Sequence, residues 1–187
     1  MGTQWLSQSM RPRERVLAAL AGEPIDRPAA VCPTSIATES LMDLVDAPFP
    51  QAHRDPDLMT RLAETAYTEA GFDSIMPVFS IVQESAALGC DVDWADKTNW
   101  PTCVGSLAKS ADEIRIPDDV LNHPDAHCVL ESLRQLKQRW GDEVALIGKT
   151  MGPWTLADHV VGTQPFLLMT LDDPAGVKTV PYTHMTL

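Results

Sequence analysis

The sequence has no apolar run long enough to cross a membrane and few basic residues. No stretch reaches the ~18 consecutive apolar residues that a transmembrane helix needs, and no apolar segment of the secretory type follows Met1. Only 14 Lys and Arg stand against 26 Asp and Glu, which gives a net charge of -12. Such a surface repels nucleic acid and anionic lipid. We therefore expect a cytoplasmic protein that has neither nucleic acid nor a membrane as its partner.

The sequence also lacks any CxxC pair. Its four cysteines are widely spaced and are Cys32, Cys90, Cys103 and Cys128. In a reducing cytosol, isolated thiols are mostly buried or idle. We interpret these four in that way.

Two histidines are spaced as metal ligands can be. His123 and His127 are four residues apart, and Cys128 is adjacent to the second. However, Pro124 lies between them, and no glutamate stands where a general base would be needed. We interpret the stretch as a solvated helix start, with a metal site as the alternative.

Hydrophobic periodicity predicts the fold class. Short apolar runs indicate buried strands, at 29–32, 73–79 and 144–148. Amphipathic patterns and caps predict helices, at 11–22, 55–71, 81–88, 125–140, 154–161 and 165–171. A further predicted helix runs to residue 45, and either Ser35 or Thr38 could cap it. The irregular stretch 91–117 has room for a short edge hairpin. An opening helix followed by three strand–helix repeats predicts a parallel α/β fold.

The last residues give a contradictory signal. Asp172-Asp173-Pro174 is a strong helix start, with an acidic cap and a proline in the first turn. Gly176 and the following Thr179-Val180-Pro181 are poor helix material. We expect an interrupted reading frame or a cut chain here, with an ordinary disordered tail as the alternative. The chain then divides into a disordered N-terminus at 1–10, one domain at 11–177 and an aberrant or truncated tail at 178–187.

Four short stretches occur in an order that resembles one family. They are RERVLAALAGEPIDRP at 13–28, FPQAH at 49–53 with GFD at 71–73, ESAALG at 84–89, and GPWTLA at 152–157. Their order and spacing resemble the uroporphyrinogen decarboxylase superfamily. The FPQAH segment is similar to the methylcobamide:coenzyme M methyltransferases, its corrinoid-dependent branch.

The resemblance implies a TIM (β/α) barrel. Residues 11–177 would form its N-terminal part, with an N-terminal helical extension and about three of the eight strands. An open barrel leaves strand edges and apolar faces uncovered, so a dimer through the exposed barrel edge is possible. We expect the chain to be an N-terminal fragment.

The methyltransferase branch implies a zinc-dependent reaction. A methyl group would move from a methyl-corrinoid, carried by a partner protein, to a small thiol such as coenzyme M. In that branch zinc is held by a His-x-Cys pair and a later Cys, all in the second half of the barrel. This chain contains no His-x-Cys, so the resemblance implies no metal ligand here.

The decarboxylase branch implies other residues. Its members have arginines after the first strand, an aspartate after the second and a tyrosine after the third-strand motif. Here residues 32–39 contain no arginine, and the other two positions are Ser80 and His159. These differences disfavour uroporphyrinogen decarboxylation, which stays an alternative, as does a non-catalytic remnant or interaction module.

No residue can be assigned a catalytic role from the sequence, but six are substrate-cavity candidates because they follow the strands. They are Cys32, Ser80, Gln83, Glu84, Trp154 and His159. Each has a structural alternative. Cys32 could be a small buried hydrophobe, Gln83 and Glu84 could form structural hydrogen bonds, and His159 could be an ordinary surface or core residue.

Overall fold

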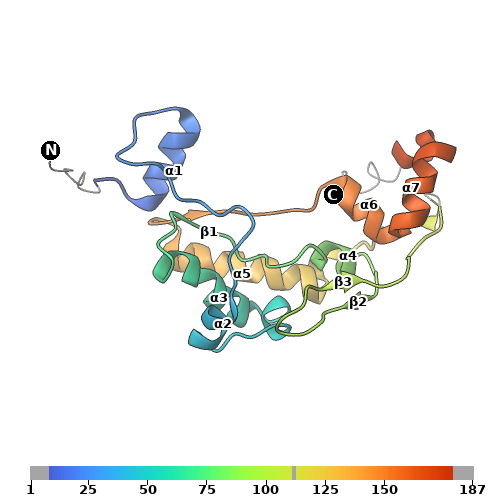
Figure 1. Ribbon diagram of the computed structural model, residues 1–187, viewed down its shortest axis with the longest axis horizontal. Coiled ribbons are helices and arrows are strands. Elements are labelled where there is room, and N and C mark those ends of the chain that lie inside the picture. Colours follow the sequence, from blue (N-terminus) through green and yellow to red (C-terminus); the bar gives the residue numbers. More distant parts are fainter. Residues whose placement is uncertain (1–8, 111–112, 179–187) are drawn as a thin grey trace. The chain divides into compact units, whose positions relative to one another are not determined.

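The computed structural model describes residues 9–110 and 113–178, and the chain divides into two compact units (Figure 1). The first unit comprises Met1–Phe79 and Val129–Lys149, and the second comprises Ser80–Cys128 and Thr150–Leu187. Most of the expected disordered N-terminus at 1–10 and nearly all of the expected aberrant tail at 178–187 lie outside the described residues.

A parallel strand pair lies in the first unit. β1 (Ser74–Ile75) pairs with β4 (Ala145–Leu146), and Ser74 is opposite Ala145. The ladder continues beyond the paired residues, because the Ile147 amide donates to the Ile75 carbonyl at 2.9 Å. These strands fall within the expected runs 73–79 and 144–148, so the chain is α/β, with shorter strands than the apolar runs suggested.

The expected first strand at 29–32 is wrong. This segment is exposed or half-buried and is not assigned as a strand. The Ala30 amide donates to the Asp73 carboxylate at 2.8 Å, and the Cys32 amide donates to Ser74 Oγ at 3.2 Å. One backbone bond, from the Asp73 amide to the Ala30 carbonyl at 2.6 Å, also joins the segment to the chain before β1. The other two bonds go to side chains, so the segment is attached to β1 without forming a ladder with it.

Helix α1 (Pro12–Ala21) is anchored by a buried arginine. Arg15 is fully buried, and its guanidinium donates to the Asp26 carboxylate at 2.6 and 3.0 Å and to Asp73 at 2.6 Å. Arg27 also donates to Asp73, at 2.7 and 2.8 Å. A buried charge is tolerated only when it is paired and hydrogen-bonded in this way. The network ties α1 and the following turn to the start of β1.

The remaining helices of this unit form its core. They are α2 (Glu39–Leu44), η1 (Gln51–His53), α3 (Pro56–Thr68) and the C-terminal part of α5 (Pro124–Trp140). The expected caps are present: Thr38 Oγ1 accepts from the Leu41 amide at 3.2 Å, and Asp55 accepts from the first-turn amides of α3. Between α3 and α5, the buried hydroxyls of Thr60 and Ser132 are hydrogen-bonded at 2.9 Å.

The second unit combines short helices with a hairpin. Its elements are α4 (Gln83–Ala87), β2 (Val92–Asp93), β3 (Thr102–Cys103), η3 (Val120–Asn122), α6 (Pro153–Val161) and α7 (Thr163–Asp172). β2 and β3 are antiparallel, with Val92 opposite Cys103, so the hairpin predicted within 91–117 is present. Its core includes Leu88, Ala108, Leu156, Val160 and Phe166.

The helix signal at the end of the chain is followed by helical residues. Residues 174–178 are helical directly after Asp173. The expectation that no helix follows was therefore wrong as far as residue 178. An acidic cap with proline in the first turn outweighs the low propensity of Gly176. Residues 179–187 lie outside the described part.

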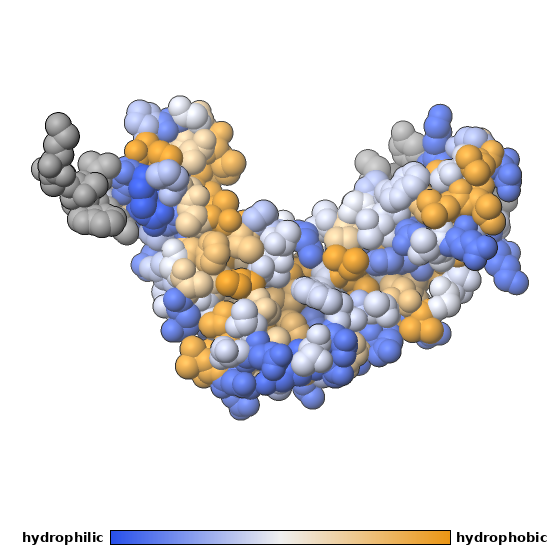
Figure 2. Space-filling view, in the orientation of Figure 1, coloured by the Kyte–Doolittle hydropathy of each residue, from blue (hydrophilic) through white to orange (hydrophobic). Residues whose placement is uncertain are grey.

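Two helices expose apolar side chains. Figure 2 shows orange side chains over α1 and over α7. They are Leu17 and Leu20 on α1, and Leu167, Leu168 and Leu171 on α7. Within residues 9–110 and 113–178, no helix is both long and apolar enough to cross a membrane.

Candidate functional site

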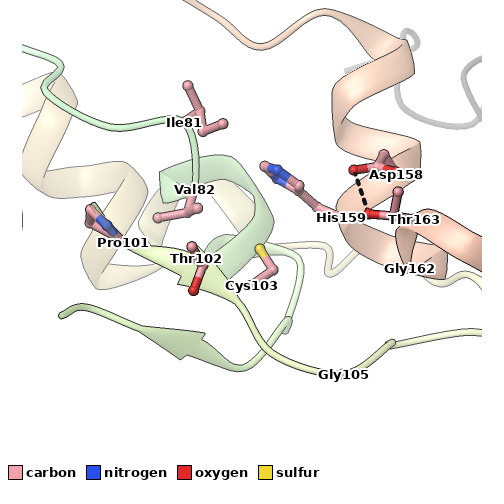
Figure 3. A pocket seen from close by; sticks show the side chains of 10 residues that line it. All are labelled: Ile81, Val82, Pro101, Thr102, Cys103, Gly105, Asp158, His159, Gly162 and Thr163. Carbon is pink, nitrogen blue, oxygen red and sulfur yellow. Dashed lines mark hydrogen bonds between the residues drawn. The ribbon is translucent and has the colours of Figure 1, made fainter. Parts of the chain in front are cut away.

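A small cavity in the second unit is lined by a cysteine and a histidine from separate elements. It measures about 230 Å³. Cys103 comes from β3 and His159 from α6, and Figure 3 shows both side chains at the same cavity. The other lining residues are Ile81, Val82, Pro101, Thr102, Gly105, Asp158, Gly162 and Thr163.

Local backbone features place these two side chains together. Gly162 ends α6 with a φ of 91°, a left-handed conformation that favours glycine. The segment after β3 returns to this helix end, because the Leu107 and Ala108 amides donate to the Val160 carbonyl at 2.8 and 3.2 Å. His159, in the last turn of α6, therefore lies beside the strand that carries Cys103.

Helix α4 and the residues just after it hold His159 in place. Its Nδ1 is 2.8 Å from the hydroxyl oxygen of Ser85, on α4. The thiol of Cys90, just after α4, is 3.8 Å from the His159 carbonyl oxygen. Three segments thus converge on His159, and both Cys90 and Cys103 are half-buried.

Hydrogen bonding separates the protonation states of the two cysteines. Hydrogen bonding with Cys90, helped by His159 and opposed by burial, lowers the pKa of Cys103 to about 5. Hydrogen bonding with Cys103, together with burial, raises the pKa of Cys90. The hydrogen bond to Cys103 raises the pKa of His159. The cluster therefore favours a Cys103 thiolate beside a protonated Cys90, and the thiolate in turn favours the charged form of His159.

Such a cluster has the chemistry of an activated nucleophile. The thiolate is the reactive form of cysteine, and a neighbouring imidazolium both stabilises it and can release a proton to a leaving group. The hydroxyl of Ser85 can accept from His159 Nδ1 and donate to the Cys103 sulfur, which fixes the ring between them.

Of the sequence candidates, His159 belongs to this cluster, whereas Glu84 lines a second cavity of about 460 Å³. The Glu84 carboxylate accepts from the Met151 amide at 3.0 Å, so it also holds the chain before α6. The apolar part of the wall of this second cavity includes Leu88, Val120 and Leu156.

Ser80 and Gln83 lie together, before and at the start of α4. Both are buried, and the Ser80 hydroxyl donates to Gln83 Oε1 at 2.6 Å. The Ser80 oxygen also accepts from the Val82 amide at 3.4 Å. Among the described atoms, Gln83 Nε2 is buried without a hydrogen-bond partner. This amide is a donor left available for another group.

Cys32 and Trp154 are not among the residues that line either cavity. Cys32 is in the first unit, where its thiol donates to the Ser35 carbonyl at 3.0 Å. Trp154 is 54% exposed, and its ring contacts Phe166 edge-on at a centroid distance of 4.8 Å. Their assignment to a substrate cavity stays a prediction, as it does for the other four candidates.

The possible metal site around His123 has a structural explanation. His123 Nδ1 accepts from the Asp125 amide at 3.3 Å at the start of α5, and Cys128 is buried. In the part of the chain that the structure describes, no three His, Cys, Asp or Glu side chains are grouped to hold a metal ion.

Sequence reasoning missed Ser85, Cys90 and Cys103 as members of a site. The available signal was the hairpin expected in 91–117, because antiparallel pairing brings residues from its two arms together. Without the register, however, the spacing of Cys90 and Cys103 carried no information.

Comparisons with known proteins point to one family. The family model described as "Uroporphyrinogen decarboxylase (URO-D)" matches residues 11–181. The "Methylcobamide:CoM methyltransferase MtbA" of Methanosarcina acetivorans is 33% identical over 152 residues, or 81% of this chain and 45% of that protein. The "Methylcobamide:CoM methyltransferase MtaA" of Methanosarcina barkeri is 31% identical over 156 residues, or 83% and 46%.

A decarboxylase and a solved structure complete the comparison. The "Uroporphyrinogen decarboxylase" of Anaeromyxobacter dehalogenans is 27% identical over 164 residues, or 81% of this chain and 46% of that protein. A methyltransferase structure from Methanosarcina mazei superposes with a TM-score of 0.87 at 27% identity, over 92% of this chain and 52% of its own. The chain spans about half the length of the curated relatives it matches.

Proposed function

Because the chain belongs to the uroporphyrinogen decarboxylase family, whose model matches residues 11–181, we propose that it is the N-terminal part of a corrinoid-dependent methyltransferase. The complete enzyme moves a methyl group from a methyl-corrinoid, held by a partner protein, to a thiol such as coenzyme M. The observation that carries this proposal is the identity of 33% to a methylcobamide:CoM methyltransferase, against 27% to a decarboxylase.

The local chemistry supports this branch over decarboxylation. A multiply acidic porphyrinogen needs cationic side chains at its carboxylates, and residues 32–39 contain no arginine. Loss of carbon dioxide from a protonated pyrrole also calls for a fixed anion. The corresponding position is Ser80, whose neutral hydroxyl is already bonded to Gln83.

We place part of the substrate cavity at the segment between β1 and α4. In a barrel, the carboxyl ends of the parallel strands meet at the active-site mouth, and Ser80, Gln83 and Glu84 follow β1 in the chain. The buried Gln83 Nε2, which has no hydrogen-bond partner among the described atoms, suits a polar atom of a substrate. Cys32, Trp154 and His159 complete the proposed candidates.

The zinc ion implied by the resemblance does not fit the residues at hand. The described residues 9–110 and 113–178 offer no group of three ligands, and the whole chain contains no His-x-Cys. We therefore propose no zinc ligand in this chain. In our proposal, zinc and its activation of the thiol belong to the remainder of the barrel.

A fusion protein tests the proposal. Residues 1–177 are joined to the C-terminal part of a methylcobamide:CoM methyltransferase, and demethylation of methylcobalamin by coenzyme M is followed by absorbance under anaerobic conditions. We expect turnover well above that of the C-terminal part alone. The matched assay uses uroporphyrinogen as substrate. Decarboxylation without methyl transfer would contradict the proposal, and a folded fusion that does neither would favour a non-catalytic interaction module.

A further inference from the structure

The Cys103 cluster has features that the proposed methyl transfer does not use. Cys103 and His159 line one cavity. The Ser85 hydroxyl lies 2.8 Å from His159 Nδ1, and the Cys90 thiol donates to the His159 carbonyl at 3.8 Å, so two thiols, an imidazole and a hydroxyl gather around His159. The cavity of about 230 Å³ is several times the ~30 Å³ that one water molecule occupies in the liquid. A small oxidant can therefore reach the Cys103 sulfur.

We propose that Cys103 and Cys90 form a reversible disulfide site for hydroperoxides, in which Cys103 is the attacking thiolate, Cys90 the resolving thiol and His159 the proton donor. The geometry for each role is present. Cys103 and His159 line the cavity. Cys90 is not among the lining residues, but it lies two residues before Val92, which is opposite Cys103 in the hairpin, and its thiol donates to the His159 carbonyl. This inference shares only His159 with the substrate-cavity candidates of the methyl-transfer proposal.

The first chemical step consumes the peroxide. The Cys103 thiolate attacks one oxygen, so a sulfur–oxygen bond forms while the oxygen–oxygen bond breaks. The departing hydroxide takes the proton of the His159 imidazolium and leaves as water. Cys103 is now a sulfenic acid, and His159 is neutral.

The second step closes the disulfide. The sulfur of Cys90 attacks the sulfur of Cys103, and the sulfur–oxygen bond breaks. The hydroxyl group leaves as water with the proton of the Cys90 thiol, which neutral His159 can relay. In total, two thiols and one hydroperoxide give one disulfide and two molecules of water, or water and an alcohol if the peroxide is organic. A dithiol reverses the change.

The backbone favours this pair over the other cysteines. Cys103 is opposite Val92, and the Val104 amide donates to the Asp91 carbonyl at 2.8 Å, so the ladder runs up to the neighbour of Cys90. Closure needs the two sulfurs to approach to about 2 Å. By contrast, Cys128 is buried and Cys32 belongs to the other unit.

Peptide mapping of the 187-residue chain tests the site directly. The reduced protein is treated with an equimolar amount of hydrogen peroxide, its free thiols are blocked with N-ethylmaleimide, and it is digested with trypsin. Cleavage after Lys97 separates Cys90 from Cys103, in peptides 62–97 and 98–109. We expect these two peptides to be linked by a disulfide that dithiothreitol reverses, with Cys32 and Cys128 still free.

Three outcomes would overturn the proposal. The first is oxidation of Cys103 to sulfinic or sulfonic acid without a linked peptide. The second is equal oxidation of all four cysteines. The third is a link that forms as fast in about 8 M urea, which denatures a small domain, as in buffer. Each of these outcomes can be measured on the wild-type chain alone.

Variants assign the roles. Cys90→Ser should keep the oxidation of Cys103 but stop at the sulfenic acid, which dimedone traps. His159→Gln should slow the oxidation of Cys103 at pH 7 at least tenfold, whereas Cys128→Ser should leave both the rate and the linked peptide unchanged. An unchanged rate in His159→Gln would contradict the assigned role of the imidazole.

Discussion

At the scale of single residues, hydrogen bonds distinguish cysteines that look equivalent in the sequence. Cys90 and Cys103 are both half-buried, yet hydrogen bonding between them moves their pKa values in opposite directions. His159 further lowers the pKa of Cys103. Burial alone would raise both pKa values, so specific partners decide which thiol is the nucleophile.

The first prediction concerns the pH dependence of alkylation at Cys103. Because its folded pKa is lowered to about 5, the thiolate is the dominant form above that pH and is lost as the pH falls through it. Iodoacetamide should therefore alkylate Cys103 at a nearly constant rate between pH 6.5 and 8, where an ordinary thiol of pKa ~8.5 changes by more than tenfold. Mass spectrometry of peptide 98–109 follows the reaction.

His159→Gln provides the matched comparison for that profile. The imidazolium is supported by Cys103 and, more weakly, by Asp158 and Glu84. Without it, the midpoint of the Cys103 profile should move to higher pH, because the thiolate loses a cationic partner. A wild-type midpoint near that of an ordinary thiol would show that the two cysteines do not share a proton in this way.

At the scale of elements, the segment ends are set by the backbone conformation of particular residues. α3 ends at Thr68, and Gly71 then turns the chain into β1 with a φ of +71°. A methyl group added at Gly71 would meet no atom within 4 Å. The cost of replacing this glycine is therefore conformational and not steric.

Gly71→Ala and Gly148→Ala form a matched pair that tests this. Both positions have open space for a Cβ, but only Gly71 has a positive φ. Gly71→Ala should destabilise the protein by about 1–2 kcal/mol, whereas Gly148→Ala should be neutral or stabilise it by up to about 1 kcal/mol. Urea unfolding followed by circular dichroism measures both. Equal effects would mean that the φ of Gly71 does not control this turn.

Local signals in the sequence predicted the helices better than the strands. Thr38 and Asp55 cap helices as expected, because a cap needs only amides from the next few residues. The run 29–32 was expected to be a strand because it is apolar. A strand, however, needs a neighbouring strand whose backbone pairs with it residue after residue. Here the side chains of Asp73 and Ser74 accept hydrogen bonds from the backbone of this segment.

The same distinction explains what was missed at the candidate site. His159 was a candidate because it follows a motif at a strand end. Cys103 and Ser85 entered the site only through the register of β2 and β3 and through the packing of α4 with α6. Ser85 and His159 are far apart in the chain, so the sequence around either residue does not indicate that they are in contact.

At the scale of the whole molecule, the exposed side chains of α7 call for a covering surface. Phe166 is the buried residue of this helix, while Leu167, Leu168 and Leu171 are exposed. A helix that is apolar on several faces is normally buried. The chain spans about half the length of its curated relatives, and the remainder of the barrel is the covering that our functional proposal supplies.

The last prediction follows from that uncovered helix. Without a covering surface, the isolated chain should self-associate through α7, and sedimentation velocity should show concentration-dependent association. Replacing both Leu168 and Leu171 by Ser removes about 3 kcal/mol of apolar burial from the contact, which weakens the association roughly a hundredfold.

Leu20→Ser is the control, because Leu20 is 80% exposed but lies on α1 in the other unit. The fusion of residues 1–177 to a methyltransferase C-terminal part should be monomeric at the same concentrations. A chain that is monomeric throughout, or a Leu20→Ser variant that loses as much association as the double variant, would contradict α7 as the contact surface.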